Sequence, residues 1–208
     1  MSQEWATGAP LAPGEHRYLA IDGASLPAGI RGLYDLGISD PPVQVLADGV
    51  HDALAPLGPL LLSLDDNPEL TGHWYQRHPA LARAVVFHTG MMLEEFAGYF
   101  RARVQVRLAD GRVVWLRLAD ANVVARLVNA ETLLPTAFWS RVTGLSYGAG
   151  QAEVRHHQLT VARLDCQGVA GFDGTAAIQP CFRFSEALVQ ALSDTQEQIT
   201  NDQHTEVL

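Results

Sequence analysis

The stretch that decides the fold is ARAVVFHTGMMLEEFAGYFRARVQVRLADGRVVWLRLADANVVARLV, residues 82–128. Its apolar run from Ala84 to His88 predicts a buried strand. A helix is expected from Gly90 to Phe100, because apolar residues recur there at four-residue spacing and Thr89 can cap the start. Two alternating runs then flank Asp110-Gly111, a pair suited to a two-residue turn, and they predict a β-hairpin.

The hairpin, Arg103 to Leu118, is predicted to have two unlike faces. A two-residue turn sets the register, and the register decides which side chains share a face. One face would carry Val104, Val106, Leu108, Val113 and Trp115. The other would carry Arg103, Gln105, Arg107, Val114 and Leu116. A face that is half apolar and half arginine is one that helices or a partner would cover.

Further elements are expected on both sides of this stretch. Upstream, three strands and one helix are predicted, over Arg17–Ile21, Val43–Leu46, Leu60–Leu64 and, for the helix, from Pro68 with Asn67 as its cap. Downstream, Asp120 caps a helix, and Pro135 begins another that carries Phe138, Trp139 and Val142. Strands alternating with helices, followed by a hairpin, indicate a mixed α/β sheet with flanking helices.

The domain organisation is predicted from the change in residue composition along the chain. Residues 1–14 are expected to be a flexible leader, and residues 15–147 the α/β domain. Glycines interrupt the chain after Tyr147, so residues 148–208 are expected to form a smaller, mostly helical lobe. Its last helix would begin after Ser185, carry an apolar stripe that includes Leu188 and Leu192, and have an acidic outer face.

The composition of the chain argues against some classes of binding partner. The net charge of the 208-residue chain is -9, and its 14 basic residues, all arginine, form no cluster. We therefore expect no binding to nucleic acid or to anionic membrane surfaces. No apolar run approaches the roughly 20 residues of a membrane helix, and the N-terminus has no secretory pattern, so we expect a cytoplasmic protein. Cys166 and Cys181 suggest reduced thiols, although a bridge between them stays open.

Several motifs are candidate sites of chemistry. Gly144-Leu145-Ser146-Tyr147-Gly148 matches the nucleophile elbow of hydrolases, but that motif needs a strand before its serine and we expect a helix there. A small serine hydrolase using Ser146 is therefore kept as the alternative. His156 and His157 would point to opposite faces of a strand and could not share one metal ion. No catalytic residue, metal site, cofactor or small-molecule substrate is expected.

The order of segments from His16 to Tyr147 resembles the adaptor-chaperone family of the bacterial type VI secretion system. The resemblance is carried by residues 82–128 and by RYLAIDGASLP, GLYDLG, VQVLADG, PLLLSLDDNPEL, LLPTAFWSRVTGL and, near the C-terminus, FRFSEALVQAL. After the hairpin the family often has an aromatic residue, aspartate and proline, where this chain has Leu118-Ala119-Asp120-Ala121. The resemblance implies a non-enzymatic chaperone that binds a toxic effector in the cytoplasm and helps load it onto the VgrG spike protein.

Two expectations about partners follow. The site for the effector is expected beside the hairpin, and its residues would be Arg103, Arg107, Val114, Leu116, Leu188 and Leu192. A further alternative is an immunity protein that neutralises a basic toxin through the acidic surface of the chain. The two differ in whether the chain protects a cell from that toxin.

Overall fold

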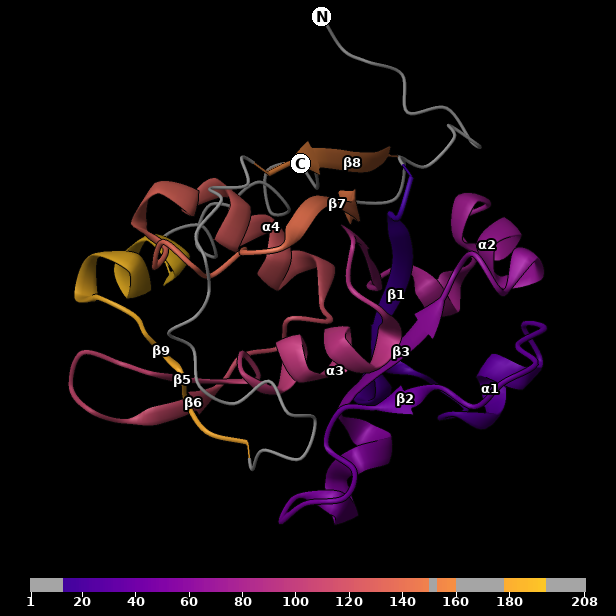
Figure 1. Ribbon diagram of the computed structural model, residues 1–208, viewed down its shortest axis with the longest axis horizontal. Helices are drawn as coiled ribbons and strands as arrows, with labels where there is room; N and C mark the ends of the chain where they lie inside the picture. Colours follow the sequence, from indigo (N-terminus) through magenta and orange to yellow (C-terminus); the bar gives the residue numbers. More distant parts are fainter. Residues whose placement is uncertain (1–12, 150–152, 160–177, 194–208) are drawn as a thin grey trace, which may run out of the picture.

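The computed structural model describes residues 13–149, 153–159 and 178–193. Two sheets organise these residues (Figure 1). Sheet A has six strands in the order β2-β3-β1-β4-β7-β8, and all of its neighbouring strands are antiparallel. Sheet B has three strands in the order β6-β5-β9, with β5 and β9 parallel. The expected mixed α/β fold is confirmed.

The strands of sheet A are β1 (His16–Asp22), β2 (Val43–Gln44), β3 (Pro59–Ser63), β4 (Val85–Thr89), β7 (Val142–Ala149) and β8 (Glu153–Gln158). Those of sheet B are β5 (Gln105–Arg107), β6 (Val113–Trp115) and β9 (Phe182–Arg183). The α-helices are α1 (Arg31–Tyr34), α2 (Pro68–Tyr75), α3 (Leu93–Arg101) and α4 (Ala121–Asn129), and helix also covers residues 186–193. Short 3-10 helices occur at η1 (Gly23–Ser25), η2 (Asp52–Leu57), η3 (Pro79–Leu81) and η4 (Glu131–Leu133).

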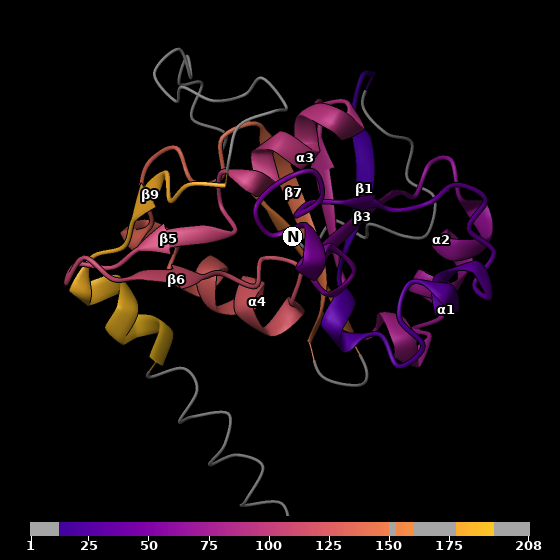
Figure 2. The same ribbon diagram turned by 90° about the horizontal axis from the view of Figure 1, so that it is seen from below.

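Sheet A separates two apolar cores, because successive side chains of a strand point to opposite faces. One face packs against α1 and α2, through Leu19, Val86, Leu33, Leu70 and Trp74. The other packs against α3, α4 and sheet B, through Phe87, Leu145, Phe100, Val124 and Val106. Figures 1 and 2 show α1 and α2 on one side of sheet A and the hairpin β5–β6 on the other.

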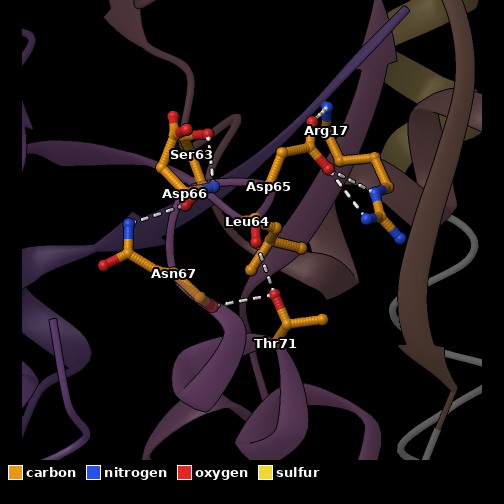
Figure 3. Close-up of polar contacts among 7 residues, drawn as sticks. All are labelled: Arg17, Ser63, Leu64, Asp65, Asp66, Asn67 and Thr71. Carbon is orange, nitrogen blue, oxygen red and sulfur yellow. Dashed lines mark hydrogen bonds and ion pairs between the residues drawn. The ribbon is translucent and has the colours of Figure 1, made fainter. Parts of the chain in front are cut away.

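The turn between β3 and α2 is held by its own polar side chains (Figure 3). Asp65 accepts hydrogen bonds from the backbone N–H of Arg17 at 3.0 Å and from its Nε at 2.8 Å, and so ties this turn to β1. The Thr71 hydroxyl lies 2.7 Å from the Leu64 carbonyl oxygen. Asn67 precedes α2 as expected, but its side chain does not cap the helix; its amide donates to the Ser63 carbonyl instead. Asp120 does cap α4, by accepting from the Asn122 N–H.

The hairpin differs from its prediction by one residue. The Leu108 N–H donates to the Arg112 carbonyl and the Gly111 N–H to the Leu108 carbonyl, so the connection has three residues. Gly111 adopts a φ of 90°, which favours glycine and is typical of such loops. Because side chains alternate, the one-residue shift exchanges the faces of β6. Val114 therefore lies opposite Val106 and faces the core, and Trp115 lies opposite Gln105 on the other face.

The helix expected from Pro135 is wrong: turns occupy residues 136–141, and β7 follows. Phe138 and Trp139 are buried as predicted, but from these turns. The Phe138 carbonyl accepts hydrogen bonds from the Arg103 Nε and the Tyr99 hydroxyl. Long-range contacts thus use backbone groups that a helix would have paired locally.

The described part of the C-terminal region does not form a separate lobe. Strand β7 runs through the expected boundary at Tyr147 and pairs with β8, while β9 joins sheet B. Phe182, Phe184 and Leu188 are buried in the same core as α3 and α4. Most of the expected leader, Cys166 and the end of the last helix lie outside the described residues; Cys181 is exposed. Within the described ranges, no helix has the length and apolar character needed to cross a membrane.

Candidate functional site

Exposed apolar side chains gather where the segment around η2 meets β6. Leu54 and Leu57 come from the first segment and Trp115 from the second, and all three line one pocket. Val50 and Val113, on the same two segments, are also exposed. The two segments are in contact, because the rings of His51 and Trp115 meet edge-on with centroids 4.9 Å apart. Scattered exposed apolar residues are ordinary, whereas a gathered set is typical of an interaction surface.

A groove of about 260 Å³ opens beside this set and is called the Trp115 groove here. Its lining is mostly apolar and includes Leu46, Leu54, Leu57, Trp115 and Leu116. Gly58 also lines it, and a Cβ atom there would come within 2.6 Å of the Leu46 side chain, which would have to shift. At its rim, Arg117 contacts Asp22 at 2.5 Å.

The face of sheet B that carries Trp115 is called the open face. Register places five side chains on it: Gln105, Arg107, Val113, Trp115 and Arg183. Arg107 donates to the Gly111 carbonyl at 3.2 Å and Arg183 to the Ala109 carbonyl at 2.7 Å. Among the described residues, no carboxylate forms an ion pair with either arginine. The open face therefore combines positive charge with apolar surface.

Arg103 is not a surface residue, and its predicted place on an exposed face is wrong. It is 1% exposed, and its Nε, Nη1 and Nη2 donate to the carbonyls of Phe138, Tyr99 and Ala137 at 2.7, 2.9 and 3.1 Å. Its guanidinium also lies 3.4 Å from the Tyr99 ring centroid. Burial raises the pKa of Tyr99 to about 12, so this phenol stays neutral. Arg103 stabilises the core and cannot contact a partner in this structure.

The other predicted site residues do not lie together on one surface. Arg107 is exposed on the open face, and Leu116 lines the Trp115 groove. Val114 and Leu192 are half-buried against the core, and Leu188 is fully buried. The described part of the last helix does not line the Trp115 groove; its Glu186 and Val189 line a pocket of about 330 Å³ at the hairpin tip instead. The sequence-based prediction of the site did not include Trp115, Leu54 or Leu57. A three-residue loop at Ala109–Gly111, in place of the predicted two-residue turn, would have placed Trp115 on the exposed face.

A second candidate site surrounds Ser146, where β4, β7 and β8 lie side by side. The Ser146 hydroxyl lies 2.8 Å from the His156 Nδ1 and 3.2 Å from the His88 Nε2. The three residues line a cavity of about 290 Å³, together with Glu15, Thr143, Gly144, Leu145, His157 and Gln158. Burial lowers the pKa of both His88 and His156, so both imidazoles are neutral at pH 7. A neutral imidazole beside a hydroxyl can accept its proton.

The geometry around Ser146 nevertheless departs from a nucleophile elbow. A strand precedes the serine, contrary to the expected helix, and a strand is what a hydrolase would need. That strand does not end at Ser146, however; it continues to Ala149 and pairs along its length with β8. Ser146 is only 3% exposed. The predicted divergence of His156 and His157 is confirmed, since His157 contacts Glu131 at 3.0 Å.

Comparison with models of protein families finds a match. The sequence model of a family described as "Domain of unknown function (DUF4123)" matches residues 17–133, which run from β1 through η4. No curated protein and no solved structure matches the chain. In the described part of the chain, no group of three or more His, Cys, Asp or Glu side chains is arranged to hold a metal ion.

Proposed function

This chain belongs to the DUF4123 family, and on that premise we propose that it is an adaptor of type VI secretion. It binds a toxic effector protein in the cytoplasm and helps to load it onto the VgrG spike. No catalytic step, metal or cofactor of its own is needed for this role. The observation that carries the proposal is the pairing of the open face with the Trp115 groove.

The composition of this surface suits protein binding. Aromatic and arginine side chains dominate the energetics of many interfaces, and Trp115, Arg107 and Arg183 are of these types. The apolar groove can accept side chains of a partner, and the arginines can orient acidic or carbonyl groups over the sheet. We expect the bound segment of the effector to be apolar with a carboxylate nearby.

Co-purification of the full chain with the effector tests the proposal. Leu57→Asp places a charge in the Trp115 groove and is expected to weaken effector binding at least about tenfold, because the partner would have to desolvate that charge. Leu133→Asp is the matched control, since Leu133 is 43% exposed and Leu57 56% exposed, and only Leu57 lines the groove. Equal binding by both folded variants would contradict the placement of the site.

A serine hydrolase remains the second candidate, and one observation favours it: the 2.8 Å contact between the Ser146 hydroxyl and the His156 Nδ1. In that function Ser146 would attack an ester carbonyl and His156 would take its proton. Hydrolysis of a small aryl ester by the parent chain, lost in Ser146→Ala, would support it.

A further inference from the structure

We infer that the effector segment binds in an extended conformation, as an added strand on the free edge of β6, with side chains entering the Trp115 groove. This inference rests on the proposed function and specifies its binding mode. It adds recognition of the backbone of the effector segment, which binding through the side chains of the open face alone would not require.

The hydrogen-bond pattern of the hairpin identifies the free edge. The Leu108 N–H donates to Arg112, and the Leu116 N–H donates to Val104. In an antiparallel pair, bonded and non-bonded residue pairs alternate. Val114 is therefore bonded to β5, whereas the N–H and carbonyl groups of Val113 and Trp115 point away from it. Among the strands that the structure describes, β6 lies at the edge of sheet B, so these four groups face outward.

The side chains of this edge leave it open to pairing. Natural edge strands are commonly blocked by lysine, proline or inward-pointing charge. Strand β6 consists of Val113, Val114 and Trp115, and none of them is charged. Val113 and Trp115 are also exposed, and the Trp115 groove begins at the end of the strand. A strand laid along β6 would thus continue directly over an apolar groove.

The chemistry of the edge favours an extended occupant over a helix. A helix satisfies its own backbone groups and would leave those of Val113 and Trp115 without protein partners. An extended segment satisfies them and presents alternate side chains to the open face, next to Val113 and Trp115. Arg107 lies opposite Val113 on the neighbouring strand, where it can meet a carboxylate of the segment.

A synthetic peptide tests this mode with the full chain. The probe is an acetylated and amidated peptide of alternating valine and threonine with one glutamate, about seven residues long, roughly the length of an ordinary strand. Its control has the same sequence with N-methyl groups on alternate residues, which remove the donors facing β6. We expect the probe to slow amide exchange at Val113 and Trp115 but not at Val114, and the control to bind at least about tenfold more weakly.

Four results would overturn the inference: no binding up to about 1 mM probe, equal binding of both peptides, protection at β8 rather than β6, or protection that appears without peptide as the chain pairs with itself. Each leaves the proposed function standing if the effector still co-purifies with the chain. Loss of co-purification with the unaltered chain would instead remove the proposed function. The two failures are therefore distinguishable.

Discussion

The rings of His51 and Trp115 meet edge-on at 4.9 Å and join two segments that lie far apart in the sequence. His51 directly precedes η2, and Trp115 ends β6. This contact holds the leucines of η2 beside the hairpin, so the two segments form the two sides of the Trp115 groove. The proposed binding site thus depends on tertiary packing and not on either segment alone.

Arg103 is expected to stabilise the fold. Arg103→Met removes the buried guanidinium that donates to the carbonyls of Phe138, Tyr99 and Ala137 and should lower the free energy of unfolding by about 3 kcal/mol. Arg107→Met is the matched control on the same hairpin and should change it by less than about 0.5 kcal/mol. Urea unfolding measures both, and equal losses would contradict the structural role of Arg103.

The fold is expected to lose stability in mild acid because of His88 and His156. Burial lowers the pKa of both imidazoles below the ordinary value of 6.5, so the unfolded chain binds protons that the folded chain does not. Their contribution is complete above about pH 6.5 and is lost as the pH falls below it. The negative charge of Glu15 raises the pKa of His88 and the positive charge of Arg17 lowers it, but burial is the larger effect.

Thermal unfolding between pH 5 and 8 checks this dependence. His156→Gln should reduce the slope of stability against pH, because it removes one of the two titrating groups. His51→Gln is the control, since His51 contacts Trp115 and does not line the cavity around Ser146. A slope that His156→Gln leaves unchanged would mean that its imidazole does not titrate differently in the folded and unfolded chain.

The regular elements could be predicted more fully than their connections. The segment from Pro68, the helix after Thr89 and the capped helix after Asp120 carry apolar periodicity and local start signals, and they occur as α2, α3 and α4. The hairpin strands were also predicted. Asp110-Gly111 fits both a two-residue and a three-residue loop. The choice between them shifts the register by one residue, and the predicted two-residue loop places Trp115 on the wrong face of the hairpin.

The two candidate sites depend on contacts that no local pattern contains. Ser146 meets His88 from β4 and His156 from β8, and the pairing of β7 with both strands is a property of sheet order. The sequence predicts a helix over the turns at residues 136–141, because buried Phe138 and Trp139 fit a helical pattern as well as they fit these turns. Arg103 and Tyr99, which are distant in sequence, donate hydrogen bonds to the Phe138 carbonyl and so favour the turns over a helix.

Ser146→Ala is expected to leave effector binding and delivery unchanged. The substitution removes one hydroxyl that does not line the Trp115 groove and breaks its two contacts with imidazoles. Effector co-purification and an aryl-ester assay on both proteins check the expectation. Ester hydrolysis by the parent that disappears in the variant, together with lost delivery, would favour the hydrolase.

Metal removal is expected to have no effect on thermal stability. Among the described residues, His, Cys, Asp and Glu form no group suited to a metal ion, and the proposed role needs none. The melting temperature should be the same with and without a chelator. A fall of several degrees that added zinc reverses would reveal a structural metal.

Effector secretion in a strain that lacks this chain tests the central claim most directly. The measurement compares the effector and VgrG in the culture medium of the parent, of the deletion strain, and of that strain complemented with the unaltered chain, Leu57→Asp or Leu133→Asp. We predict that deletion removes the effector but not VgrG from the medium, and that the unaltered chain and Leu133→Asp restore it while Leu57→Asp does not. Unchanged effector secretion in the deletion strain would contradict the adaptor function.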